Sequence, residues 1–136
     1  MSGKNTYSVT AKNVKNDCSE VIFGKSDIIF DSGKNRNLDF IGPAELLCSS
    51  FAACTLKNVS RFSEMLPFQY EYAEVEVIAE RHDSPPSIEK IFYRLKIKTN
   101  EDDHRVELLH TNIKKFGTIF NTLAKALHVE GEIIKI

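Results

Sequence analysis

No residue is charged from Leu46 to Leu56, a stretch that follows a Gly-Pro pair at positions 42 and 43. Proline is favoured in the first turn of a helix, and Glu45 places a negative charge where the helix dipole prefers one. The residues after it are apolar or small in every direction around a helix, which is typical of a helix buried on all faces. The pattern predicts one long central helix that becomes amphipathic over Lys57–Glu64 and ends before Pro67.

A different pattern, with a period of two residues, follows this helix. Apolar positions alternate with glutamates and Ile78 between residues 73 and 80, and with lysine, arginine and Phe92 between residues 90 and 98. Such alternation is typical of strands with one buried face. The acidic outer face of the first strand and the basic outer face of the second favour an antiparallel pair joined by cross-strand ion pairs. We expect a loop over His82–Ser87, because Pro85 and Pro86 interrupt regular pairing.

Shorter elements are predicted on either side of these features. In chain order we expect a strand at Thr6–Val14, a hairpin of Glu20–Phe23 and Asp27–Phe30, a polar loop at Asp31–Asn37, a helix capped by Asp102 or Asp103, a left-handed turn at Gly117, a helix at Thr118–Leu127 and a strand at Val129–Ile136. This order predicts an α+β protein in which antiparallel sheets wrap around the buried central helix. We expect residues 1–136 to form a single domain.

Composition narrows the possible functions. The chain has 136 residues, a net charge of −1 and three cysteines, and it contains no CxxC motif. A net charge near zero gives no reason to expect nucleic acid as a partner, and no apolar run is long enough to cross a membrane. The cysteine count and the spacing of the four histidines favour neither a disulfide framework nor a metal site. We therefore expect a cytoplasmic protein without a metal or cofactor.

Two segments carry a family likeness. Pro43-x-Glu45-Leu46-Leu47 followed by Ala52-Ala53-Cys54 resembles the P-x-E-L-L…(A/G)-(A/G)-C helix of the OsmC/Ohr family. The segment from Lys114 to Leu123 resembles the K-Y-C-x-V-S-N-T-L segment of the same family, and the Pro85-Pro86 hairpin also fits. The resemblance covers nearly the whole chain, from about Tyr7 onwards. It implies an OsmC-like fold and an intertwined homodimer, with the long helices at its centre and the reactive sites at the subunit interface.

The resemblance also implies thiol-dependent reduction of organic hydroperoxides, a role in oxidative stress defence. The family's attacking cysteine corresponds to Cys54, and its second cysteine, which forms a disulfide with the first, corresponds to Gly117. The best-characterised hydroperoxidases carry a glutamate where this chain has Ala44, and Glu45 matches the next position. The family activates its cysteine with an arginine from the N-terminal part of the chain, and Arg36 is the only arginine before Arg61.

The chemistry of a reactive Cys54 can be stated from its place in the chain. The thiolate is the nucleophile, and an ordinary thiol is mostly protonated at neutral pH. Because Cys54 lies about three turns inside its helix, far from the helix N-terminus, the cation that activates it must come from another element. Arg36, oriented by Glu45, is the candidate. Attack on a hydroperoxide gives a sulfenic acid, which an external thiol must reduce unless Cys18 reaches it.

Other interpretations stay open at this point. Cys54 is a small core residue in one of them, as Cys48 is expected to be. In another, the protein is a non-catalytic dimer that binds a hydrophobic small molecule at its interface. The apolar residues that would suit such a ligand are Phe40, Leu47, Phe51, Phe62, Met65, Phe116 and Phe120. A hot-dog-type thioesterase also has a sheet around one helix, with an acid such as Glu45 near it, but the predicted strand order fits the OsmC layout better.

Overall fold

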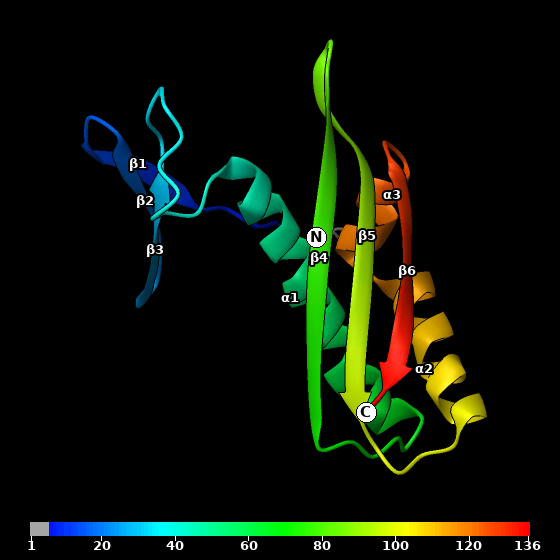
Figure 1. The fold of residues 1–136 in the computed structure, drawn as a ribbon. Helices are drawn as coiled ribbons and strands as arrows, with labels where there is room; N and C mark the ends of the chain where they lie inside the picture. The colour runs from blue at the N-terminus through cyan, green and yellow to red at the C-terminus, as the bar shows by residue number, and fades with distance from the viewer. Residues whose placement is uncertain (1–5) are drawn as a thin grey trace. The chain divides into compact units, whose positions relative to one another are not determined.

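The computed structural model describes residues 6–136 and confirms an α+β fold. Its elements are β1 (Thr10–Lys15), β2 (Cys18–Phe23), β3 (Ser26–Asp31), α1 (Pro43–Met65), β4 (Tyr72–Asp83), β5 (Pro86–Lys98), α2 (Asp103–Phe116), α3 (Thr118–Ala124) and β6 (His128–Lys135) (Figure 1). The chain divides into two compact units, one up to Leu46 and one over Leu47–Ile136. The predicted central helix is present as α1, which begins at Pro43 and ends before Pro67 as expected.

The N-terminal unit is built on a three-stranded antiparallel sheet in the order β1-β2-β3. Gly24 lies in the tight turn between β2 and β3 with a φ of 57°, a conformation that glycine adopts without steric cost. The first strand begins at Thr10 rather than at the expected Thr6. Several large apolar side chains of this sheet and the segment before it are exposed, namely Val9, Val14, Ile22, Phe23, Ile28 and Ile29.

The second sheet has the order β4-β5-β6, with β4 antiparallel and β6 parallel to β5. A parallel neighbour requires a long crossover, which α2 and α3 provide. The expected loop over His82–Ser87 is wrong, because strand pairing continues to Asp83 and Pro86 and leaves only Ser84 and Pro85 in the turn. Proline is tolerated there because Pro86 is the first residue of its strand.

The two faces of this sheet differ as their alternation predicts. Ile91, Tyr93, Leu95 and Ile97 are each at most 1% exposed and point toward the core. On the outer face, Arg94 pairs with Glu76 of β4 at 3.5 Å, which confirms one cross-strand ion pair. The shorter contacts go instead to β6, from Arg94 to Glu132 and from Lys90 to Glu130. The basic face of β5 is thus shared between both neighbouring strands.

The core of the second unit lies between this sheet and the helices, which gather on one side of it in Figure 1. Val59 and Phe62 of α1 pack there with Leu109 and Ile113 of α2 and with Leu95 of β5. The side chain of Asp102 caps α2 by accepting a hydrogen bond from the backbone N–H of Arg105 at 2.9 Å, as its position predicts. The sheet and α2 therefore hold α1 along one face.

In a single copy of the chain, α1 is buried on one face only. Its buried residues are Phe51, Thr55, Asn58, Val59 and Phe62, which follow helical spacing. On other faces Ala53 is exposed and Leu56 is 37% exposed. The sequence predicts burial on all faces of this helix, and one copy provides it on the side that contacts the sheet and α2.

Gly117 connects α2 to α3 with a φ of −71° and a ψ of 116°, so the predicted left-handed turn is wrong. The reason is that α3 begins at the next residue. Gly117 is both the C-cap of α2 and the N-cap of α3, and an N-cap residue takes an extended conformation. The glycine is explained by space instead, because a Cβ at this position would lie 3.0 Å from the carbonyl oxygen of Ile113.

Candidate functional site

Cys54 lies half-buried on α1, one helical turn before Asn58. Residues four apart face the same side of a helix, and the Nδ2 of Asn58 donates a hydrogen bond to the Sγ of Cys54 at 3.5 Å. Asn58 is only 6% exposed, so its carboxamide is held inside the protein. The thiol therefore has a fixed polar neighbour of its own in the second unit.

Position 117 lies beside the same carboxamide. A Cβ built on Gly117 would be 3.4 Å from the Nδ2 of Asn58 and 3.1 Å from the Cβ of Phe120. The fold thus brings Cys54 of α1 and the junction between α2 and α3 close to the same side chain. These are the two positions that the family resemblance pairs, although they are 63 residues apart in the chain.

Aromatic side chains fill the core next to this group. The ring centroid of Phe51 lies 5.4 Å from that of Tyr93 and 5.9 Å from that of Phe120. Phe51 and Phe62, two of the apolar residues that would suit a hydrophobic ligand, are 1% and 2% exposed and belong to the core. Phe116, another of them, is 46% exposed although its ring lies 5.5 Å from that of Phe62.

A buried polar pair lies in the same aromatic cluster. The hydroxyl of Tyr93 and the Nε2 of His110 are 2.7 Å apart, and both residues are buried. Burial raises the pKa of Tyr93 to about 12. Burial also lowers the pKa of His110, and the nearby charge of Lys114 acts in the same direction. His110 therefore has a hydrogen-bond partner inside the core.

Arg36 and Glu45, the other two predicted site residues, form an ion pair in the N-terminal unit. The Nη2 of Arg36 donates to the Oε1 of Glu45 at 2.9 Å, and the same oxygen accepts the backbone N–H of Gly42 at 2.8 Å. A Cβ on Gly42 would lie 2.8 Å from that carboxylate oxygen and 3.2 Å from the guanidinium carbon of Arg36. Glycine at 42 therefore lets the pair pack directly against the backbone.

Asp31 binds the arginine of this pair. Its carboxylate, 5% exposed, accepts the backbone N–H groups of Gly33 and Asn37 and the Nη1 of Arg36 at 3.1 to 3.2 Å. These hydrogen bonds, the Gly33 amide first and the Arg36 guanidinium after, lower the pKa of Asp31. The loop that the sequence predicts as polar is thus ordered around one carboxylate, which fixes the direction of Arg36.

The structure adds two residues that the sequence did not single out. Asp31 could have been recognised from the Asp-Ser-Gly start of the loop, because aspartate commonly bonds to backbone N–H groups two residues ahead. Asn58 could have been noticed from its i+4 spacing to Cys54 within an otherwise small and apolar stretch. Of the predicted residues, Arg36 and Glu45 come together in the first unit, whereas Cys54 belongs to the second.

Cys18 begins β2 and is half-buried, as is Cys48 on α1. Among residues 6–136, no three His, Cys, Asp or Glu side chains are placed so that they could hold a metal ion. No helix in this described part is long and apolar enough to cross a membrane.

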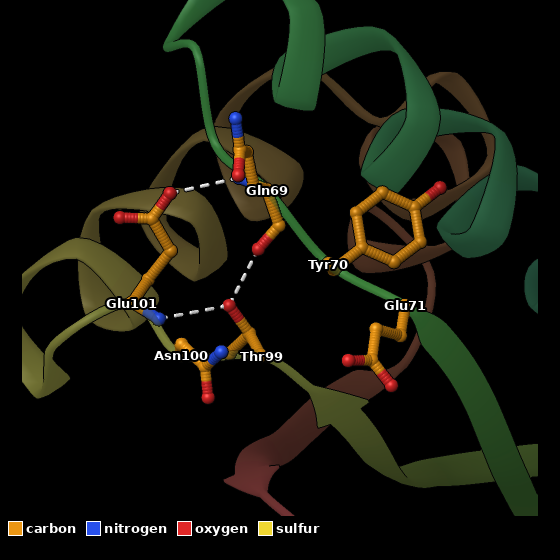
Figure 2. Close-up of a pocket in the computed structure, with 6 residues that line it drawn as sticks. All are labelled: Gln69, Tyr70, Glu71, Thr99, Asn100 and Glu101. Atoms are coloured by element: carbon orange, nitrogen blue, oxygen red, sulfur yellow. Dashed lines mark hydrogen bonds between the residues drawn. The ribbon is translucent and has the colours of Figure 1, made fainter.

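A pocket of about 330 Å³ lies where the segment before β4 meets the segment after β5 (Figure 2). Its lining is polar and consists of Gln69, Tyr70, Glu71, Thr99, Asn100 and Glu101. These groups bond to one another, for example from the backbone N–H of Gln69 to Glu101 at 2.8 Å and from that of Glu101 to Thr99 at 3.0 Å. The pocket contains none of the predicted site residues and serves as a hydrogen-bonded joint between two chain segments.

Comparison with known proteins supports the family resemblance. Residues 35–132 match the model of the OsmC-like protein family. An OsmC-like protein from Mycoplasma pneumoniae superimposes with a TM-score of 0.88 at 17% identity, over 97% of this chain and 98% of that one. An organic hydroperoxide resistance protein OsmC from Legionella pneumophila gives a TM-score of 0.70 at 16% identity, over 96% and 99%.

An organic hydroperoxide resistance protein from Elizabethkingia anophelis gives a TM-score of 0.76 at 13% identity, over 98% of this chain and 99% of that one. At these identities the superpositions show a shared fold. A sequence search among curated proteins found no match. The family match spans most of the chain and favours the OsmC layout over the hot-dog layout. The chain therefore belongs to the OsmC-like protein family.

Proposed function

We propose that this protein is a thiol-dependent peroxidase that reduces organic hydroperoxides through Cys54. Family membership supports the proposal, and two of its structural neighbours are named organic hydroperoxide resistance proteins. The observation that carries it furthest is that Cys54 and position 117, the counterparts of the two family cysteines, lie beside the same buried side chain, Asn58. A nucleophile at 54 and a partner thiol at 117 would be neighbours in this fold.

The reaction begins when the Cys54 thiolate attacks one oxygen of the hydroperoxide O–O bond. A sulfur–oxygen bond forms, the O–O bond breaks, and the leaving alkoxide takes up a proton to become an alcohol. Cys54 is then a sulfenic acid. Because residue 117 is glycine, an external thiol attacks this sulfur and releases water, and a second thiol frees Cys54 from the resulting mixed disulfide.

In the proposed reaction, Arg36 activates the thiol. Its guanidinium is permanently charged, and a nearby cation favours a thiolate over a thiol. Asp31 and Glu45 each accept a hydrogen bond from it, so its charged end has a defined direction. In this proposal Glu45 orients the arginine and does not itself react with the peroxide.

We further propose that the working protein is a homodimer. Phe23 is 64%, Val14 50% and Ile29 46% exposed on the first sheet, and Leu56 is exposed on the central helix. A second copy that covers such residues would bury their apolar surface, and each Å² buried stabilises the dimer by about 25 cal/mol. Light scattering at working concentrations should give twice the mass of the chain, and a monomer would contradict this part of the proposal.

Hydroperoxide consumption tests the catalytic proposal. Wild type with dithiothreitol as reductant should consume cumene hydroperoxide over many turnovers, whereas Cys54→Ala should not. Cys48→Ala removes a second cysteine from the same helix and serves as the matched control, which should retain wild-type activity. If wild type and Cys54→Ala consume the hydroperoxide equally slowly, the protein is not a peroxidase.

Glycine at position 117 specifically favours a second candidate function, a non-catalytic dimer that binds a hydrophobic small molecule. Without a cysteine at position 117, the family's disulfide between the counterparts of positions 54 and 117 cannot form. If the protein is of this kind, wild type and Cys54→Ala should bind an apolar fluorescent probe equally well. Neither should consume hydroperoxide. Turnover that depends on Cys54 decides between the two.

A further inference from the structure

Asn58 is an unusual residue for its position on the central helix. Asparagine has a poor helix propensity, and its neighbours on the buried face of α1 include Phe51, Val59 and Phe62. A buried carboxamide costs free energy unless its polar atoms find partners. The Nδ2 of Asn58 donates to the sulfur of Cys54, which is a weak acceptor while it is a neutral thiol.

The same contact becomes much stronger when the sulfur carries a charge. Hydrogen bonds to an ionised acceptor are shorter and roughly twice as strong as those between neutral groups. Because Asn58 is buried, its N–H dipole acts through a medium of lower dielectric constant than water. A neutral donor of this kind stabilises the thiolate without adding a charge that would itself need a counterion.

Gly117 provides the room for this arrangement. A Cβ at 117 would already contact Asn58 at 3.4 Å, and it would be tight against the carbonyl oxygen of Ile113 and the Cβ of Phe120. A full cysteine side chain, with its large sulfur one bond further out, would compete for this crowded space. Position 117 and the carboxamide of Asn58 are therefore direct neighbours in this packing.

We propose that Asn58 is a catalytic residue of the Cys54 site, whose carboxamide N–H donates to the thiolate and raises the fraction of Cys54 in that form. This inference rests on the proposed function, since it assigns the residue to the same reaction. Asn58 and Gly117 together make a single-cysteine site, in which the donor to Cys54 lies beside position 117. The sulfenic acid formed on Cys54 is then reduced by external thiols.

The test measures alkylation of Cys54 by iodoacetamide as a function of pH, in a background where Cys18 and Cys48 are replaced by alanine. Asn58→Leu keeps a similar volume without the donor, and Asn58→Asp keeps the shape but adds a negative charge. At neutral pH the rate should fall about tenfold in Asn58→Leu and further in Asn58→Asp, whereas the plateau at high pH should stay near that of the background protein. A packing change alone would alter the plateau as well.

Asn112→Leu is the matched control. This asparagine also donates along its own helix, from Nδ2 to the carbonyl oxygen of Leu108 at 2.9 Å, and it should leave the alkylation profile unchanged. Thermal unfolding checks that each variant is folded. If Asn58→Leu does not fold, the isosteric Asn58→Asp carries the comparison.

An alkylation rate at neutral pH that is equal to the background in either folded Asn58 variant would overturn the inference. Alkylation requires no peroxide, so its result is independent of whether the protein reduces hydroperoxides. A protein with an Asn58-dependent thiolate that consumes no hydroperoxide would refute the peroxidase proposal and leave the role of Asn58 on the sulfur standing.

Discussion

Gly131→Ala is predicted to destabilise the protein more than a glycine-to-alanine change in a strand normally would. Gly131 of β6 lies directly opposite Tyr93 of β5. A Cβ added there would lie 2.4 to 2.5 Å from three ring atoms of Tyr93, including the Cγ, which only the Cβ separates from the backbone. The ring is 1% exposed and lies between the helices and the sheet, so it has to move to make room.

The magnitude follows from what this movement breaks. Inserting a methyl group into a packed core costs about 1–3 kcal/mol. Displacing the ring also breaks the 2.7 Å contact between the Tyr93 hydroxyl and His110, and leaving buried polar groups unpaired costs about 1–3 kcal/mol more. Alanine also lowers the conformational entropy of the unfolded chain, which stabilises the folded protein by about 0.4–1 kcal/mol. We expect a net loss of about 1–6 kcal/mol in the free energy of unfolding.

Urea denaturation of four proteins measures this loss: wild type, Gly131→Ala, Tyr93→Phe and the double variant. Tyr93→Phe removes the hydroxyl and keeps the ring, so it already loses the contact with His110. Gly131→Ala should therefore cost at least about 1 kcal/mol less in the Tyr93→Phe background than in wild type. Additive effects, or a loss below about 0.5 kcal/mol in Gly131→Ala alone, would refute the reasoning.

Three further predictions follow from the same contacts. Gly117→Cys should lower the free energy of unfolding by about 1–3 kcal/mol in urea denaturation, because its Cβ would be tight against Ile113 and Phe120; an unchanged midpoint would show that the junction has room. Because the pKa of His110 is lower in the folded protein than in the unfolded chain, the unfolded chain binds more protons as the pH falls. The contribution of neutral, buried His110 to the free energy of unfolding is therefore fully present above about pH 6.5 and is lost as the pH falls below it. His110→Gln should flatten that decrease in denaturation midpoints, and an equally steep decrease would exclude His110 as its source. Arg36→Met keeps the apolar stem and removes the charge, so it should slow alkylation of Cys54 at neutral pH; a rate equal to wild type would mean that another group activates the thiol.

Much of the fold could be predicted because its patterns are local. The uncharged stretch after Pro43 gave the central helix, and the alternation around Val75 and Leu95 gave two strands whose buried faces are as expected. The sequence pattern placed Gly117 in a left-handed turn, since glycine commonly ends a helix that way. It could not reveal that a second helix begins at the next residue, nor that a Cβ there would be tight against Ile113 and Phe120.

The candidate site was predictable in part. The family motif led to Cys54 as the candidate nucleophile. Arg36, in the polar loop and the only arginine before Arg61, was expected to be oriented by Glu45, and the structure contains this pair at 2.9 Å. Asp31 and Asn58 were missed because their roles depend on contacts that form only after folding. Asn58 in particular becomes informative only when the junction at position 117, distant in sequence, is seen beside it.

The most direct test of the central claim is intact-mass spectrometry after treatment with cumene hydroperoxide, with dimedone present to trap sulfenic acid. Wild type should gain one dimedone adduct that maps to Cys54, and Cys54→Ala should gain none. Cys18 and Cys48, both half-buried, provide an internal comparison within the same chain. If Cys54 is labelled no faster than these two cysteines, it is not a peroxide-reactive thiol, and the account of this protein as a peroxidase fails.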